Sequence, residues 1–534
     1  MKKTLLTLLL SMTLLSISFA QLVEISGDIT SDMTLTNNRT YKLVGFVRVW
    51  PPATLTIQEG TLIVGDNASQ GSLIIEPGGK INANGTEQNP IVFTSEFALA
   101  GSGGSPTYGD WGGIILLGNA KINVPGGTAE IEGPGDTYGG NDDDDNSGVM
   151  RYVRIEYPGI AFSLNNEING LTFGGVGRGT TIEHIQVSFS GDDSYEWFGG
   201  TVQCKYLIAY RGWDDDFDTD FGFTGKLQFL LGVRDPEVAD QSSSNGFESD
   251  NDGSGTLNTP ITSPTWWNVT LIGPLETVST PINPLFKRGM HLRRSSRNKI
   301  SNTIIMGWPT GIRLDGQNTI QAAIDGNMWI DNSIVSGWNV VAMDTVSSGG
   351  LNFNIDTWFA NSGGRTYAAN TDVMLTDPFN LTNPNAMPLA GSPALTGADT
   401  PPNDGFFDPS ATFVGAFGSV NWMANWTDFS PENYPVSVDE NELSGLPTTF
   451  SVSQNYPNPF NPSTKIVYSV TEGSNVKLTV FDVLGREVEV LVDGFKSAGI
   501  YELNFNAENL PSGLYLYTFE AGSTKITKKM TLLK

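Results

Sequence analysis

Cysteine and histidine are almost absent from this sequence of 534 residues. The single cysteine, Cys204, excludes an internal disulfide, and the two histidines, His184 and His291, form no cluster with zinc-site spacing. Any bound metal is therefore expected to have oxygen ligands. Basic residues are also few, because 30 Lys and Arg stand against 57 Asp and Glu, giving a formal net charge of -27. A chain this acidic is repelled by phosphate backbones, so we expect no nucleic-acid partner.

Apolar runs long enough to cross a bilayer are also lacking. The run from residue 5 to residue 15 is shorter than the roughly 20 residues that a spanning helix needs. It follows Lys2 and Lys3 and precedes the small-x-small tripeptide that ends at Ala20, which is the pattern of a signal peptide over residues 1–20. We expect cleavage after Ala20 and no membrane-spanning segment in the mature chain.

Helical periodicity is missing as well, and short β-rich runs separated by Gly, Asn, Asp or Pro take its place. One phrase recurs at residues 268–273 (NVTLIG), 302–307 (NTIIMG) and 332–337 (NSIVSG). A phrase repeated once per coil favours a parallel β-helix, in which apolar residues point inward and Asn or Gly marks a corner. The sequence therefore predicts an all-β chain with a β-helix body over residues 21–429.

The acidity is confined to one part of the chain. Residues 21–448 carry 49 acidic and 20 basic residues, whereas residues 449–534 carry eight of each. Residues 430–446, rich in Pro, Glu, Asp, Asn and Ser, are predicted to be a flexible linker. The alternating runs beyond it predict a small antiparallel β-sandwich over residues 447–534, for which a carbohydrate-binding or immunoglobulin-like module is one interpretation.

Several segments of the body carry a family resemblance. They are residues 27–30 (GDIT), 53–60 (ATLTIQEG), 90–95 (PIVFTS), 196–200 (EWFGG), 213–220 (WDDDFDTD), 245–252 (NGFESDND), 391–395 (GSPAL) and 413–417 (FVGAF). In these the body resembles right-handed parallel β-helix proteins of the pectin-lyase-like fold, among them surface and secreted proteins of Bacteroidetes-type bacteria. The resemblance implies a fold and no particular reaction.

The C-terminal region carries a second resemblance in residues 455–462 (NYPNPFNP), 481–488 (FDVLGREV), 510–515 (LPSGLY) and 528–534 (KKMTLLK). It is similar to the type A C-terminal sorting domain of the type IX secretion system. The residues assigned to its motifs are Asn455, Tyr456, Pro457, Asn458, Pro459, Phe460, Gly485 and Gly513. The resemblance implies the type IX machinery as a partner, passage through the periplasm and across the outer membrane, and removal of the domain on release or surface attachment.

Carboxylates are concentrated in the middle of the body, and we interpret them as a calcium site. The candidate ligands are Asp192, Asp193, Glu196, Asp214, Asp216, Asp218, Asp220, Glu248, Asp250 and Asp252. Carboxylates on consecutive coils, roughly 4.8 Å apart, repel one another unless a counter-ion such as calcium lies between them. The alternation from Asp214 to Asp220 predicts four carboxylates on one face of an extended segment. A solvated acidic surface is the alternative.

Two classes of function remain open. The first is a cell-surface or secreted glycan-binding or structural protein, in which Trp197, Trp213, Trp266, Trp267 and Trp308 either stack on sugars or pack in the core. The second is a polysaccharide lyase or glycoside hydrolase acting on an acidic polysaccharide. Polygalacturonases of this fold carry a Gly-Asp-Asp like that at Asp192 and Asp193, although their companion motifs are absent here.

A lyase would also need a base. The candidates are Lys287, Arg288, His291, Arg293 and Arg294. The alternative is that these residues neutralise Asp and Glu on neighbouring coils.

Overall fold

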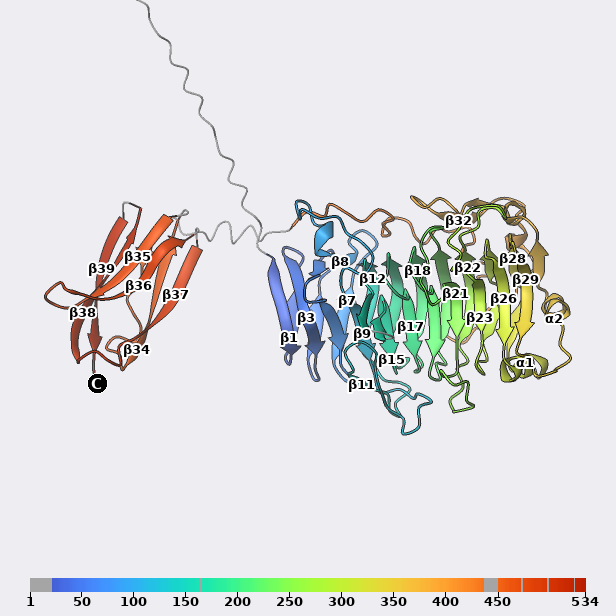
Figure 1. Cartoon of the computed structure of the whole chain (residues 1–534), viewed down its shortest axis with the longest axis horizontal. Coiled ribbons are helices and arrows are strands. Elements are labelled where there is room, and N and C mark those ends of the chain that lie inside the picture. The colour runs from blue at the N-terminus through green and yellow to red at the C-terminus, as the bar shows by residue number, and fades with distance from the viewer. Residues whose placement is uncertain (1–21, 164–165, 437–449, 472–473, 497–498, 523) are drawn as a thin grey trace, which may run out of the picture. The chain divides into compact units, whose positions relative to one another are not determined.

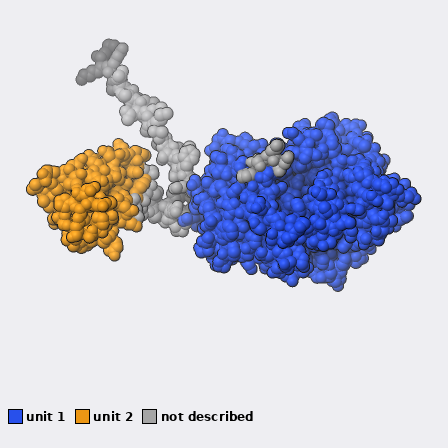
Figure 2. Space-filling model, turned by 60° about the horizontal axis from the view of Figure 1, so that its bottom comes forward, with its two compact units in different colours: residues 1–437 blue, residues 438–534 orange. Residues whose placement is uncertain are grey.

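Three parallel ladders of strands, one rung per coil, form the body in this computed structural model (Figure 1). The structure describes residues 22–163, 166–436, 450–471, 474–496, 499–522 and 524–534, so the predicted signal peptide and Ala20 lie outside the described residues. The chain divides into two compact units, residues 1–437 and 438–534 (Figure 2).

Several strands of the first ladder are long and bend at a corner, so that one part of each lies in this ladder and the other part lies in one of the other two. Its strands are β1 (Val23–Ile29), β3 (Thr40–Val49), β5 (Leu62–Gly65), β8 (Ile91–Ser95), β12 (Gly148–Glu156), β16 (Thr181–Ser188), β18 (Gln203–Tyr210), β20 (Lys226–Val233), β22 (Thr265–Ile272), β25 (Ile304–Met306), β28 (Ile334–Ser336) and β30 (Arg365–Tyr367).

The second ladder includes the ends of β1 and β3. It continues through β6 (Ser72–Ile75), β9 (Gly113–Leu117), β15 (Leu171–Gly174), β17 (Tyr195–Phe198), β19 (Phe217–Asp220), β21 (Asn245–Ser249), β23 (Arg288–Leu292), β26 (Thr310–Asp315) and β29 (Val341–Val346).

The third ladder includes the first halves of β12, β16, β18, β20 and β22. Its other strands are β2 (Met33–Leu35), β4 (Thr54–Ile57), β7 (Lys80–Asn84), β24 (Lys299–Ser301) and β27 (Trp329–Asp331).

Short elements decorate the coils. They are helices α1 (Gln317–Ile324) and α2 (Ile355–Asn361), the 3-10 turns η1 (Glu96–Ala98), η2 (Asn370–Val373) and η3 (Pro393–Leu395), and the hairpins β10 (Ala129–Glu130) with β11 (Thr137–Tyr138), β13 (Ile160–Ser163) with β14 (Asn166–Ile168), and β31 (Leu375–Asp377) with β32 (Asn385–Pro388).

The repeated Asn phrase occupies one corner of the coils. Asn268, Asn302 and Asn332 have φ of 55°, 54° and 48°, in the left-handed region that Asn tolerates better than most residues. Thr270 pairs with Ile304, which pairs with Ile334, so the three phrases stack in register. The structure confirms the predicted right-handed parallel β-helix body with a small antiparallel sandwich after it.

Aromatic side chains fill the interior of the central coils. Trp197 is buried and stacks on Phe173 with ring centroids 5.3 Å apart and on Phe223 at 5.5 Å. Trp266 and Trp308 are buried as well, and Trp267 is 7% exposed. Trp197, Trp266 and Trp308 are therefore core residues, whereas Trp267 is buried against Phe407. Trp213 is 41% exposed and stacks on Tyr108.

Residues 399–436, which we call the strap, run back along the coils toward the first ones (Figure 1). The Asn302 amide donates to the carbonyl of Asp399 at 2.9 Å, and much earlier in the chain the Gln186 amide donates to the carbonyl of Asp428 at 2.6 Å. At its end the Tyr434 hydroxyl donates to Glu156 at 2.9 Å. Residues 430–436, assigned above to a linker, thus lie against the body.

The second unit is a sandwich of two antiparallel sheets. One contains β33 (Ser451–Val452), β34 (Ser463–Val470) and β37 (Gly499–Asn506), and the other contains β36 (Glu487–Lys496), β35 (Ser474–Phe481), β38 (Gly513–Ala521) and β39 (Thr524–Leu532). Asn455 and Phe460 of the predicted sorting motif are buried, and the Asn455 amide donates to the carbonyl of Pro457 at 3.1 Å and to the Thr464 hydroxyl at 3.0 Å. Much of this motif therefore holds the sandwich together.

Candidate functional site

The acidic face lies on the outer side of the second ladder, and strand alternation explains it. In β17 and β19, Tyr195 and Phe217 point inward, so Glu196 and Asp218 point outward. Asp218 pairs in register with Glu248 of β21, so these three carboxylates stack on consecutive coils. The turns before the strands add further carboxylates. The acidic face comprises Asp192, Asp193, Glu196, Asp214, Asp215, Asp218 and Glu248.

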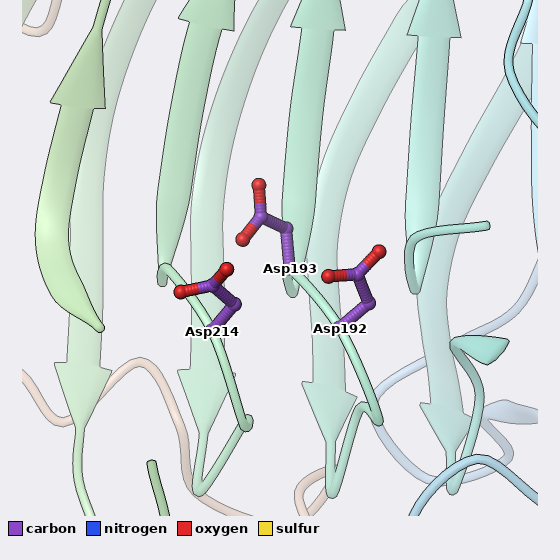
Figure 3. A group of neighbouring side chains, drawn as sticks. All are labelled: Asp192, Asp193 and Asp214. Carbon is purple, nitrogen blue, oxygen red and sulfur yellow. The ribbon is translucent and has the colours of Figure 1, made fainter. Parts of the chain in front are cut away.

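Among the residues that the structure describes, three groups on this face place one oxygen per residue within 4.8 Å of the others. They are Asp192, Asp193 and Asp214 (Figure 3); Asp193, Glu196 and Asp218; and Asp215, Asp218 and Glu248. Asp193 and Asp218 each belong to two groups, so the groups form a continuous row along the β-helix. Clustered carboxylates of this kind can hold a metal ion.

Most carboxylates of this row accept hydrogen bonds from amide groups or, at Asp214, from the Ser242 hydroxyl, and not from cations. The Asn169 amide donates to Glu196 at 2.5 Å, and the Asn245 amide donates to Glu248 at 3.0 Å. Within the described part of the chain, no Lys or Arg lies within ion-pair distance of the first six residues of the acidic face, while Glu248 pairs with Arg293. The negative charge of the row is therefore left largely uncompensated by the protein.

Burial and mutual repulsion raise the pKa of these carboxyl groups. Burial, and next the charge of Glu248, raise the pKa of Asp215 to about 8. The pKa of Asp193 is raised by burial and then by Asp215, and that of Asp218 by burial and then by Glu248. Without a cation, these groups hold protons more tightly than ordinary carboxyls do.

The four alternating aspartates do not share one face. Asp216 is fully buried and pairs with the equally buried Arg234 at 2.9 Å. The strand β19 begins only at Phe217, so the strict alternation of an extended chain does not apply before it. Asp220 lies in the strand but outside the three groups, and its carboxylate accepts a hydrogen bond from the backbone N–H of Phe221 at 2.6 Å.

Asp250 and Asp252 also lie outside the groups. Asp250 pairs with Arg293 at 2.8 Å and with Arg294 at 2.6 Å. Asp252 accepts hydrogen bonds from the backbone N–H of Ser254 at 2.9 Å and of Thr256 at 3.1 Å. Their oxygens therefore have protein partners.

Two carboxylates near the acidic face were not among the predicted ligands. Asp215 belongs to the third group, and it lies between Asp214 and Asp216 in a run of three aspartates. Glu132 comes from a long excursion between β9 and β12, and it accepts a hydrogen bond from the Asn169 amide at 2.8 Å. Burial raises the pKa of Glu132 to about 7. No local pattern around Glu132 in the sequence indicates this position.

The five basic candidates divide into paired and unpaired residues. Arg293 and Arg294 are held by Asp250, as expected for neutralising residues. His291 lies between Glu248 at 3.4 Å and Asp315 at 3.5 Å, and burial followed by the charge of Arg288 lowers its pKa to about 3.

Lys287 and Arg288 have no ion-pair partner among the residues that the structure describes. Lys287 donates to the carbonyl of Pro284 at 2.7 Å. Arg288 is half-buried and has only Asn245, at 3.5 Å, as a hydrogen-bond partner among the described residues.

Of the hollows in the described surface of the body, two are lined by basic candidates or by the strap. One of about 410 Å³ lies beside Arg294, Asp315 and the start of α1. The other, of about 340 Å³, lies between the strap and the coils and is lined by the aromatic residues Tyr206, Phe229, Phe413 and Trp422 and by Asp408, Ser410, Ala411, Ala416, Gly418, Ser419 and Val420. We call the second one the aromatic hollow.

The coil architecture and the sequence together match a known family. The family model described as a pectate-lyase-like beta helix domain matches residues 27–376. The chain belongs to this family. A second family model, a secretion system C-terminal sorting domain, matches residues 454–532. This pectate-lyase-like β-helix chain is therefore exported across the outer membrane, to the cell surface or the medium, and its partner in export is the type IX machinery.

Other comparisons add little for this pectate-lyase-like chain. Among solved structures it is similar to the enzymatically active domain of the bacteriophage CBA120 tailspike protein 2, at 12% identity and a TM-score of 0.21, covering 92% of this chain and 72% of that one. A TM-score this low supports no inference. The search of curated proteins found no match. Within the described residues, no helix has both the length and the apolar character needed to cross a membrane.

Proposed function

We propose that this exported β-helix binds calcium on its acidic face and acts outside the cell as a glycan-binding or structural protein. The observation that carries the proposal is the continuous row of three carboxylate groups, linked through Asp193 and Asp218 and largely without basic partners. A stable fold does not ordinarily hold so many buried like charges together unless protons or cations neutralise them.

The donor atoms favour calcium over other metals. The row offers carboxylate oxygens and, among the described residues, no sulfur ligand. Calcium takes six to eight oxygens in irregular geometry, whereas magnesium demands a near-ideal octahedron and keeps several waters. The neutral His291 lies next to Glu248 rather than inside a group, which leaves an all-oxygen site.

The aromatic hollow supports the glycan-binding part of the proposal. Its volume of about 340 Å³ falls in the range of small-molecule sites. Trp422 lines this hollow and supplies apolar ring surface for the C–H face of a sugar, while Tyr206, stacked between His184 and Phe229, forms part of its wall. Asp408 accepts a hydrogen bond from the Ser410 hydroxyl at 2.7 Å and is positioned to accept others from sugar hydroxyls.

A polysaccharide lyase is a second candidate, and Arg288 is the observation that favours it. A lyase needs a cation to neutralise a uronate carboxylate and a base to remove the neighbouring proton. Arg288 lies on the same ladder as the acidic face, lacks a described carboxylate partner, and has a pKa lowered first by burial and then by Arg313. A guanidinium in this setting gives up a proton more readily than an exposed one.

One experiment separates these functions. The purified chain is incubated with neutral and acidic polysaccharides, with calcium or with a chelator, while unsaturated products are followed by absorbance and reducing ends by colorimetry. Thermal melting is recorded under the same conditions. The first proposal predicts a higher melting temperature in calcium and no product. Calcium-dependent product that disappears in Arg288→Ala establishes the lyase, and a melting temperature indifferent to calcium overturns the calcium site.

A further inference from the structure

The turn between β35 and β36 in the sorting domain is rigidly built. The Asp482 carboxylate accepts hydrogen bonds from the backbone N–H of Leu484 at 2.9 Å and of Arg486 at 3.0 Å, and from the Arg486 side chain at 2.7 Å. The N–H of Gly485 donates to the carbonyl of Asp482 at 3.0 Å, and Gly485 has a φ of 78°, which favours glycine. The turn therefore has a defined shape.

This rigid turn presents apolar side chains to solvent. Val483 is 63% exposed and Leu484 is 74% exposed. Neither belongs to the buried core of the sandwich, which is formed by residues such as Val480, Tyr517 and Phe519. A turn whose hydrogen bonds are satisfied internally does not need two apolar residues at its tip, so their presence points to a contact outside the domain.

A hollow of about 380 Å³ adjoins the turn and extends the apolar surface. Leu510, Pro511 and Leu514 contribute to its lining, and Leu514 is 43% exposed. The Tyr515 hydroxyl donates to the carbonyl of Pro511 at 2.8 Å, which fixes this wall. We call Val483, Leu484, Pro511 and Leu514 with this hollow the turn patch.

The charge of the sorting domain indicates what kind of partner the turn patch can bind. Residues 449–534 carry eight basic and eight acidic residues, so the domain has no net charge to attract a partner. At the turn itself, Arg486 is paired with Asp482 at 2.7 Å and offers no free charge. A partner that binds the turn patch must therefore do so mainly through apolar contact.

We propose that the turn patch is the surface through which this sorting domain docks on an apolar surface of the outer-membrane secretion machinery. The patch lies inside the residues matched to the sorting-domain family, 454–532, whose partner is that machinery. Its four residues come from the two segments 481–488 and 510–515, which lie far apart in the chain and meet at this hollow. Leu484, which is 74% exposed, is the expected centre of the contact.

The test uses the full chain, produced in a bacterium that has a type IX secretion system. We expect Leu484→Ser and Leu514→Ser each to reduce the amount of chain outside the cell by about tenfold or more, with folded chain accumulating in the periplasm. The matched control is Phe495→Ser, because Phe495 is 69% exposed but lies at the other end of β36. This control is expected to be exported like the parent chain.

Protease resistance of the periplasmic chain shows whether each variant is folded, and Leu484→Met, which keeps an apolar side chain, is expected to restore export. Export of Leu484→Ser and Leu514→Ser at the parental level overturns the proposal. Equal retention of Phe495→Ser overturns it too, because any loss of exposed apolar surface would then suffice. Retention of folded Leu484→Met also contradicts a docking contact that depends on apolar character.

Discussion

Calcium binding at neutral pH is expected to release protons from the acidic face. In each group the oxygens lie within 4.8 Å, and two charges at that distance repel by about 3.5 kcal/mol at an effective dielectric constant of about 20. Three pairs amount to about 10 kcal/mol, which is comparable to the whole free energy of unfolding of a domain. Three ionised carboxylates without a cation are therefore not sustainable in one group.

Protonation resolves the repulsion at a smaller cost. One proton removes two of the three repelling pairs in a group, which lowers the free energy of the group by about 7 kcal/mol. Placing that proton at pH 7 on a carboxyl with an ordinary pKa costs about 4 kcal/mol. The metal-free groups are therefore expected to hold about one proton each, and each calcium ion displaces it.

Titration calorimetry measures this release directly. Calcium is titrated into the chelator-treated chain at pH 7 in two buffers, PIPES and Tris, whose heats of ionisation differ. About one proton is expected to pass to the buffer for each calcium ion bound. The heat measured per bound ion should therefore differ between the two buffers by about the difference in their heats of ionisation. Equal heats in the two buffers would refute the reasoning, because the carboxylates would then be ionised before calcium binds.

A matched pair of variants locates the effect. Asp193→Asn removes a charge shared by two groups and keeps an oxygen that can accept the hydrogen bond from the backbone N–H of Asp215, which is 2.7 Å long. We expect it to weaken calcium binding about tenfold or more, to release fewer protons and to stabilise the metal-free chain. Asp252→Asn makes the same change of charge outside the groups and is expected to leave the binding heats unchanged.

Two further predictions concern stability. In chelator, the urea midpoint is expected to fall as pH rises from about 4 to about 8. The pKa of Asp215 is raised to about 8 in the folded state, so the folded chain holds this proton over a pH range in which the unfolded chain has lost it. A midpoint independent of pH would contradict this. Tyr434→Phe removes the hydrogen bond that Glu156 accepts and is expected to cost about 1–3 kcal/mol in urea unfolding, whereas Tyr456→Phe, at an exposed site, is expected to cost little. An equal effect of the two would show that this hydrogen bond of the strap adds no stability.

The coils were predictable because the residues that mark their corners and strands lie close together in the sequence. An Asn at each corner and an apolar pair in each strand are visible in three phrases, and these phrases stack in the structure. The same locality made the sorting domain recognisable, since its motif residues also hold its sandwich together. Alternation within β17, β19 and β21 then placed Glu196, Asp218 and Glu248 on one side of the ladder.

The exact grouping of carboxylates was not predictable, because coil lengths vary. The step from one rung of the first ladder to the next is 22 residues between Ile185 and Leu207 but 39 between Leu230 and Val269. Spacing alone therefore does not tell which aspartates meet. Glu132 shows the limit most clearly, since it reaches Asn169 from an excursion whose path depends on the assembled coils.

The tryptophans illustrate a different limit. An indole near a strand end can face either way, and the sequence left sugar stacking and core packing open for all five. Trp197 proved to be enclosed by Phe173 and Phe223, while Trp213 remained exposed. Whether an indole is buried or exposed depends on where its strand begins relative to the corner of the coil. That position is a property of the assembled coil.

The strap also sets the order in which the molecule can be completed. Glu156 and Tyr434, which share a hydrogen bond, are 278 residues apart in the chain. Contacts over such separations form late and slow folding, because a long loop must close first. As the chain folds, its early coils therefore keep one flank bare until residues 399–436 pack against them. Anything that binds the unfinished chain meets that bare flank, and the last residues of the body are the ones that displace it.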